Sequence, residues 1–433
     1  DEIVHFGNIN TGEPAWTFAA ARPPSSLTSP RPMFSDNRQR KDAFRHGVTA
    51  LACILWAATA VAEPGADHGW AEPGDLGLRN DLQLLNDRGV INIPLTAWPV
   101  AWGDVERALA DTDLDSLNGD STAALLRVRS RLEKAMPAGV TDFGFSLGGT
   151  DEARIIRTFE YTPREDVEAN ASLAWKGERF AVNLSASVVD DPADGDEIRP
   201  DGTYLGVRLG NWMLSAGWQD RWWGPGRDGS LILSTNSRPS PGIGIQRIAS
   251  TAPEWKWLRW LGPWTLTSFM NELDDERDVK DAWLWGFRAS FRPIPSLEIG
   301  LSRTAQWCGE DRLCDLETFF RVLNGNDNKG ANVDEEDEPG NQLAGIDMRW
   351  VLPNEIPVAL YMQWIAEDTR RTGFSLRLWM QQFGIEHGGR LGTLSHRTHV
   401  EIVVTNTHLG ARGGGCAVRV GGWALWGFSG GGG

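Results

Sequence analysis

The chain has few of the residues on which many enzymes and nucleic-acid-binding proteins depend. Its 433 residues include seven histidines, four cysteines and three tyrosines, and 58 acidic residues outnumber 42 basic ones for a net charge of −16. This balance argues against a nucleic-acid partner, because phosphate binding needs clustered lysine and arginine. A nucleophilic enzyme needs a serine or cysteine near a histidine, yet no histidine stands beside a motif such as GxSxG. We therefore expect no nucleic-acid partner, no catalytic residues and no enzyme.

Long hydrophobic runs are also missing, apart from one segment near the start. Residues 47–62 are apolar, follow a basic stretch and end in the small residues Ala60-Val61-Ala62, which is the layout of a signal peptide. A buried helix is the alternative, but it would leave the basic flank unexplained. We expect residues 1–46 to be an unstructured upstream segment with the charged start of this leader, and residues 47–62 to be its apolar part and cleavage site.

The opposite end of the chain departs from the rest in composition. Residues 410–433 include eleven glycines, a density that does not easily sustain a packed strand. We interpret this segment as an aberrant tail, produced by a reading-frame slip or by the end of a fragment.

Cysteine and histidine patterns give no strong metal motif. Cys308 and Cys314 lie close together in WCGEDRLCD, and in an exported protein they predict a disulfide, since two thiols alone make a poor zinc site. His399 and Glu401 share a strand face and could hold a metal, but such a pair is more often structural. The acidic run at residues 334–338 lacks the glycine spacing of a calcium loop. We expect no cofactor.

What the chain has in abundance is two-residue alternation between residues 141 and 407. In one example Trp285, Phe287, Ala289 and Phe291 alternate with Gly286, Arg288, Ser290 and Arg292. The strands of a soluble sheet also alternate apolar and polar residues, but here one face carries full charges in strand after strand. A polar interior with the apolar face toward lipid explains that pattern. The fold class predicted for residues 141–409 is therefore mainly β: a transmembrane antiparallel β-barrel of about 16–18 strands, which the tail can leave incomplete.

A small helical module is predicted before the barrel, at residues 63–140. Asp75 can cap a helix that ends at Gly89, and a second helical turn runs from Gly103 to Leu109. A third helix begins near Asp120. The alternative is an independent soluble domain, but the linker to the barrel is too short for much freedom.

The densest cluster of aromatic and polar residues lies at residues 221–247, RWWGPGRDGSLILSTNSRPSPGIGIQR. Glycine and proline at this density predict a shaped loop. Tryptophans beside arginine and amide groups suit a sugar, whose apolar face stacks while its hydroxyls form hydrogen bonds. An aromatic turn that only fills space is the alternative. Asp220 and Asp228 could also form a pair of carboxyl groups for glycoside hydrolysis, but nearby arginines keep carboxylates ionised, which makes them poor general acids. The candidate polysaccharide-binding residues are Trp222, Trp223, Arg221, Arg227, Asp228, Asn236, Arg238 and Arg247.

Two blocks, at residues 78–109 and 221–247, resemble the capsule assembly Wzi family of bacterial outer-membrane proteins, and the resemblance covers most of residues 76–408. It implies an outer-membrane barrel of about 18 strands with a periplasmic helical module. It also implies lectin-like binding of capsular polysaccharide.

The function predicted from these observations is binding of capsular or extracellular polysaccharide at the cell surface, to attach or assemble it. The expected partners are this polysaccharide and outer-membrane lipid, and we expect a monomer. Trp222 and Trp223 would stack on sugar rings, and the arginines would meet uronate carboxylates. A porin or diffusion channel is the alternative, followed by a barrel enzyme that acts on glycan or lipid.

Overall fold

The structure is a computed structural model. It describes residues 69–114, 117–135, 139, 141–151, 153, 156–177, 179–192, 194–274, 279–310, 312, 314–323, 342–352, 358–367, 377–391, 394–406 and 416–420. The expected leader at residues 47–62 and the upstream segment lie outside these residues. Of the expected tail, residues 416–420 form a strand, which corrects the view that the whole tail is unsuited to one. This stretch, CAVRV, contains no glycine, and its two valines favour a strand.

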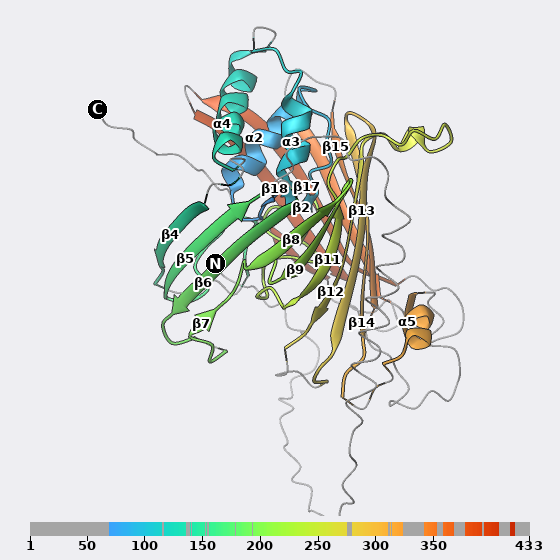
Figure 1. The fold of residues 1–433 in the computed structure, drawn as a ribbon. Helices are drawn as coiled ribbons and strands as arrows, with labels where there is room; N and C mark the ends of the chain where they lie inside the picture. Colours follow the sequence, from blue (N-terminus) through green and yellow to red (C-terminus); the bar gives the residue numbers. More distant parts are fainter. Residues whose placement is uncertain are drawn as a thin grey trace, which may run out of the picture.

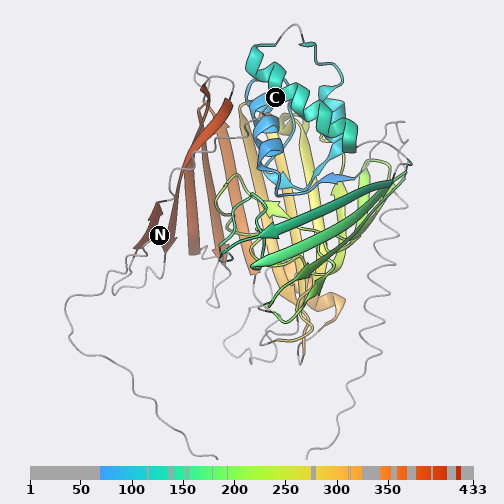
Figure 2. The same cartoon turned by 90° about the vertical axis from the view of Figure 1, so that its left-hand side faces the viewer.

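Most described strands form one antiparallel sheet of 15 strands. Its strands are β4 (Thr141–Gly149), β5 (Val167–Lys176), β6 (Phe180–Val189), β7 (Ile198–Arg199), β8 (Tyr204–Leu209), β9 (Trp212–Gly217), β11 (Gly242–Arg247), β12 (Trp264–Glu272), β13 (Trp283–Ile294), β14 (Leu297–Trp307), β15 (Gln342–Val351), β16 (Val358–Glu367), β17 (Arg377–Leu391), β18 (Leu394–Asn406) and β19 (Cys416–Val420). Neighbours in the sequence are neighbours in the sheet, with two exceptions: β9 pairs directly with β11, and β6 pairs directly with β8 while β7 pairs with β6 alone. The sheet curves around an interior that inserted segments occupy (Figures 1 and 2). A large antiparallel sheet with few helices agrees with the predicted class.

The two faces of this sheet differ sharply in exposure. Phe145 is 77% exposed on β4, and Ile346 is 42% exposed on β15, whereas its neighbour Asp347 is 1% exposed. On β13 Arg288 is also only 1% exposed. Two-residue alternation therefore places charged side chains inside and apolar ones outside, as the sequence predicts.

A helical module lies over one end of the curved sheet (Figure 1). It consists of α2 (Leu76–Asp87), α3 (Trp102–Leu109) and α4 (Gly119–Ala135). The Asp75 carboxylate accepts a hydrogen bond from the Leu78 N–H at 2.7 Å, and Gly89 adopts a φ of 72° just after α2. This is the capping and termination that the sequence predicts. No helix in the part of the chain that the structure describes has the length and apolar character needed to cross a membrane.

The module buries its own apolar core. Leu82, Leu85, Val105, Leu125 and Val128 are fully buried in one cluster. Two small two-stranded sheets hold its connecting segments: β1 (Trp70–Ala71) pairs with β3 (Val100–Ala101), and β2 (Ala97–Trp98) pairs with β10 (Trp222–Trp223). Because β10 belongs to the segment between β9 and β11, this pairing joins the module to a loop inside the sheet.

Buried ion pairs and hydrogen bonds attach the helical module to the inner face of the curved sheet. Glu298 on β14 accepts hydrogen bonds from the backbone N–H groups of Leu95 and Thr96 at 2.7–3.0 Å. It also lies 3.6 Å from Arg292 on β13. At the end of α2, Arg349 of β15 donates two hydrogen bonds to Asp87 at 2.6 and 2.9 Å.

We predict that Glu298→Gln weakens this attachment. The substitution leaves the Arg292 guanidinium buried without its carboxylate, and breaking a buried ion pair costs about 3–5 kcal/mol. Denaturant unfolding of the folded protein in detergent measures the loss. Glu310→Gln, at an exposed position, is the matched control, and equal stability of the two variants would contradict the prediction.

Candidate functional site

The segment between β9 and β11, residues 218–241, folds into the interior of the sheet and contains most of the expected site residues. Trp222 and Trp223 are both 0% exposed. Trp222 packs edge-on against Phe159 at 5.5 Å and donates its indole N–H to the Gly226 carbonyl, and Trp223 packs against Phe269. Neither ring face is open to a ligand. This corrects the expectation that the two tryptophans form a sugar platform.

Three of the arginines predicted at the site also make their contacts to other residues of the protein. Arg221 lies 4.4 Å over the Phe269 ring and donates to the Gln219 carbonyl at 3.2 Å. Arg227 donates to the Gln83 side chain at 2.8 Å, which ties the segment to α2. Arg247 lies over Trp264 and donates to its carbonyl. All three are buried, so their guanidinium groups are used in packing and are not presented to a uronate.

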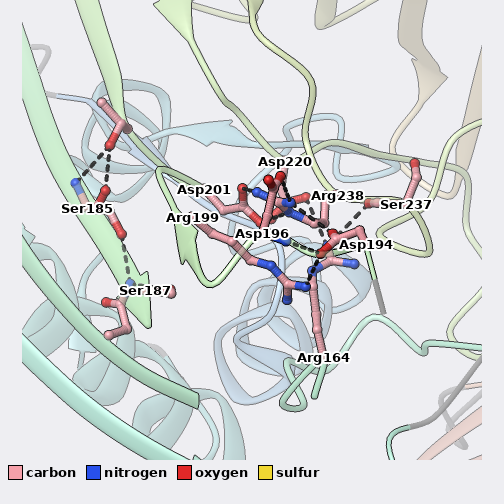
Figure 3. Close-up of polar contacts among 12 residues, drawn as sticks. Arg164, Ser185, Ser187, Asp194, Asp196, Arg199, Asp201, Asp220, Ser237 and Arg238 are labelled. Carbon is pink, nitrogen blue, oxygen red and sulfur yellow. Dashed lines mark hydrogen bonds and ion pairs between the residues drawn. The ribbon is translucent and has the colours of Figure 1, made fainter. Parts of the chain in front are cut away.

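Arg238 is the centre of a cluster of carboxylates (Figure 3). It donates to Asp201 at 3.1 Å, to Asp194 at 2.9 Å and to Asp196 at 2.8 Å. Arg199 of β7 shares Asp194 and reaches Glu165 at 2.6 Å. Although partial burial raises it, the hydrogen bonds from Arg199 and Arg238 lower the pKa of Asp194 to about 2. Asp194 is therefore ionised at neutral pH, and the cluster holds three loop segments together.

The remaining expected residues lie outside this cluster. Asn236 is exposed, and its side-chain oxygen accepts the Arg157 N–H at 2.8 Å. Asp228 is half-buried. Of the eight expected binding residues, only Arg221 and Arg238 line the cavity described next.

A cavity of about 730 Å³ opens beside the carboxylate cluster. Its walls include Phe269 of β12, Leu284 of β13 and Thr304 of β14. These positions lie toward the end of the sheet opposite the helical module, which contacts Arg292, Glu298 and Arg349 at the other end. Its lining is mixed, with an aromatic ring, hydroxyls, amides and charged groups: Trp218, Ser237, Ser240, Asn271, Gln306, Asp194, Asp196, Asp220, Glu272, Asp274, Arg221 and Arg238.

Trp218 is the cavity residue that most resembles a sugar platform, and it is not among the binding residues predicted from the sequence. It is half-buried in the cavity wall, one residue beyond β9. The sequence feature that could have identified Trp218 is its position at the start of the segment at residues 218–241, which contains most of the predicted site residues. The cavity hydroxyls and amides of Asn271, Thr304 and Gln306 carry no sequence signal, because they alternate with apolar residues like every inward position.

Two neighbouring carboxyl groups have raised pKa values: Asp220 lines the cavity, and Glu72 contacts Gln219 of the cavity wall. Burial raises the pKa of Glu72 to about 8, and the charge of Asp220 adds to the rise. Burial also raises the pKa of Asp220, against the attraction of Arg164, which lies 3.6 Å away. The two acids share the neighbour Gln219, whose amide donates to Glu72 at 3.4 Å. Glu72 therefore holds its proton at neutral pH.

The remaining predictions from the sequence concern a disulfide and metal binding. A disulfide joins Cys308 and Cys314, with their Cα atoms 4.5 Å apart. Among the residues whose side chains are described, no three His, Cys, Asp or Glu side chains gather in a group that could hold a metal ion. The side chains of His399 and Glu401 and the acidic run at 334–338 lie outside that part of the chain.

We predict that Glu72 makes the stability of the protein pH-dependent. The unfolded chain releases this proton near pH 4.5 and the folded protein near pH 8, so the stabilisation is complete below about pH 4.5 and is lost as the pH rises through about 8. Glu72→Gln removes that loss, and its melting temperature should fall less than the wild-type value between about pH 5 and pH 9. The exposed substitution Glu106→Gln is the control, and parallel curves for all three proteins would refute the assignment.

Comparisons with known proteins agree with this architecture. An uncharacterized 55.8 kDa protein in the cps region of Klebsiella pneumoniae is 34% identical over 339 residues, which are 77% of this chain and 65% of that protein. The chain thus spans somewhat less than two thirds of that relative's length. Among solved structures, Wzi of Escherichia coli is described as an outer membrane protein involved in group 1 capsule assembly and as a carbohydrate-binding β-barrel. It matches with a TM-score of 0.65 and 32% identity over 77% of this chain and 71% of that one.

The family comparison covers most of the described sheet. Residues 145–416, from β4 to the first residue of β19, match the family described as capsule assembly protein Wzi. This match extends over more than half of the sequence. It includes both the cavity walls and the segment at residues 218–241, which we call the inward segment. The chain therefore belongs to the capsule assembly protein Wzi family.

Proposed function

We propose that this protein is an outer-membrane β-barrel that binds capsular or extracellular polysaccharide and helps to attach or assemble it at the cell surface. The observation that carries the proposal is the cavity with Trp218, hydroxyls and amides, placed inside a sheet whose outer face is apolar. A sugar needs an apolar surface for its ring face and hydrogen-bonding groups for its hydroxyls. The carbohydrate-binding description of the related E. coli protein supports the same function.

The membrane location is supported by the outer face of the sheet. Phe143, Leu147, Leu184 and Leu301 are among many large apolar side chains exposed there. An apolar surface of this extent would be unstable in water but suits hydrocarbon. Strands β12 to β16 have nine to twelve residues, and a tilted strand crosses the bilayer with about 9–11. The helical module, residues 63–140 in our proposed division, would then face the periplasm.

Closure of the barrel is part of the proposal. Among the described strands, β4 and β19 stand at the two ends of the sheet order. Unpaired backbone groups at such an edge are costly in lipid. We therefore propose that residues near these two strands complete a barrel of about 16–18 strands and that the protein acts as a monomer.

The charges of the cavity bear on the kind of sugar. Asp194, Asp196 and Asp220 line it together with two further acids, against two arginines that are already paired within the protein. A free uronate would meet an excess of negative charge there. We therefore propose that the cavity contacts neutral sugar units of the polysaccharide, which departs from the arginine–uronate contacts expected from the sequence.

A diffusion channel is the less favoured alternative. Two insertions occupy the interior, since residues 91–98 bind Glu298 and the inward segment binds α2 through Arg227. Ion conductance in planar bilayers separates the two functions, because steady large openings would favour a channel.

We predict that Trp218→Ala greatly weakens polysaccharide retention. Loss of an aromatic contact at the centre of a binding site costs about 2 kcal/mol, or about 30-fold in affinity. Binding of purified capsular polysaccharide to the folded protein in detergent measures it. Trp350→Ala, on the exposed face of β15, is the matched control. If both variants retain polysaccharide equally, Trp218 is not part of the site.

A second prediction tests the charge of the cavity. Glu272→Gln removes an exposed carboxylate from the lining and should strengthen binding of a uronate-bearing polysaccharide, most clearly at low salt, while binding of a neutral one stays unchanged. Glu317→Gln, exposed on α5 (Leu316–Leu323), is the control because it does not line the cavity. Weaker uronate binding after Glu272→Gln would show that an acid in the cavity assists uronate recognition, against the proposal.

A further inference from the structure

Three tryptophans on the connection between β11 and β12 are exposed and have no role in the cavity. Trp255, Trp257 and Trp260 are 65%, 69% and 61% exposed. Trp255 and Trp257 stack on one another at 5.7 Å, with an angle of 18° between their rings. Since soluble surfaces rarely expose aromatic rings together, this group marks an interaction site. We call residues 252–263 the tryptophan loop.

The tryptophan loop has a defined shape. The Trp255 carbonyl accepts hydrogen bonds from the N–H groups of Leu258 and Arg259 at 2.9 and 3.0 Å. A short 3-10 helix, η2 (Arg259–Leu261), follows, and Gly262 ends it with a φ of 63°. The rings are thus held outward by a hydrogen-bonded turn.

The location of the loop indicates which surface it meets. It leaves the sheet at the end that carries the helical module and projects sideways, away from the wall (Figure 1). Trp260 packs edge-on against Phe291, an outward residue of β13, with ring centroids 6.0 Å apart. The aromatic surface is therefore continuous with the apolar outer face of the sheet, and it lies at the opposite end from the cavity.

The charges of the loop fit an anionic surface. Lys256 and Arg259 are exposed between the tryptophans, and Glu254 is the acidic residue beside them. Tryptophan prefers the boundary between hydrocarbon and water, where its ring is in the apolar layer and its N–H remains hydrated. A cation is also attracted to an anionic bilayer surface.

We propose that the tryptophan loop inserts into the phospholipid headgroup layer at the helical end of the barrel, where it anchors the protein and fixes its depth in the bilayer. The inference rests on the proposed outer-membrane function, because only a barrel that spans the bilayer brings this loop to the headgroup layer. A polysaccharide could also stack on these rings, but the sideways projection at the end away from the cavity favours lipid.

The test uses a fluorescent nitrobenzoxadiazole label on Glu254→Cys, which keeps all three tryptophans and both cations. Cys53 and Cys416 are replaced by serine, and the full chain is reconstituted in vesicles of phosphatidylcholine and phosphatidylglycerol that contain a headgroup nitroxide lipid. The label should be quenched by this lipid. Quenching should fall to the level of a label on Asp111→Cys, an exposed position of the helical module, when Trp255 and Trp257 are both replaced by serine.

A further label separates failure of the anchor from failure of the barrel. Phe145→Cys lies on the outward face of β4 and should be quenched by a lipid that carries its nitroxide deep in the acyl chain. If this label is quenched but the one at position 254 matches the Asp111 control, the anchor is refuted and the barrel stands. If neither responds, the proposed membrane location fails. Protection of position 254 by purified polysaccharide instead of lipid would also overturn the anchor.

Discussion

The structure depends on giving partners to the charges on the inner face of the sheet. Arg288 and Asp347 form an ion pair at 2.7 Å with side chains 0% and 2% exposed, and Arg288 also donates to Thr96 of the module at 2.8 Å. A charge buried without a partner costs several kcal/mol. The sheet and the helical module therefore stabilise one another. The sheet contributes Arg288 and Glu298, and residues 95–96 of the module supply hydrogen-bonding groups to these buried charges.

This mutual dependence decides where a ligand can bind. The module and residues 225–227 of the segment at residues 218–241 lie in the interior toward one end, where buried hydrogen bonds of 2.7–2.9 Å hold them. Among the described residues, space with a mixed polar and aromatic lining remains at the opposite end, where Trp218, Asn271 and Gln306 face the cavity. Loops that cross this end are tied together by Arg238 and its carboxylates. The same polar interactions that hold the fold therefore also shape the site.

The sequence predicted the faces of the strands well and the binding residues poorly, for physical reasons. Alternation is a local property, so Phe287 and Arg288 could be assigned to opposite faces from the sequence alone. Glycine and aspartate at helix ends are equally local, and α2 begins and ends as predicted. A Trp–Arg loop, by contrast, has the same composition whether it binds a sugar or packs internally. Trp222 is buried because Phe159 and α2 cover it, and these contacts come from distant parts of the chain.

The pairing of the arginines limits which groups could hold a polysaccharide under the proposed function. With Arg238 engaged by three carboxylates and Arg221 by Phe269 and Gln219, recognition falls to one ring, hydroxyls and amides, whose neutral contacts are individually weak. A cavity of about 730 Å³ encloses only a short part of a polymer. A polysaccharide repeats its unit, however, so a released segment is replaced by the next one at high effective concentration. Under the proposed function, weak contact with each unit would be sufficient for retention at the surface and would still allow the polysaccharide to be rearranged during assembly.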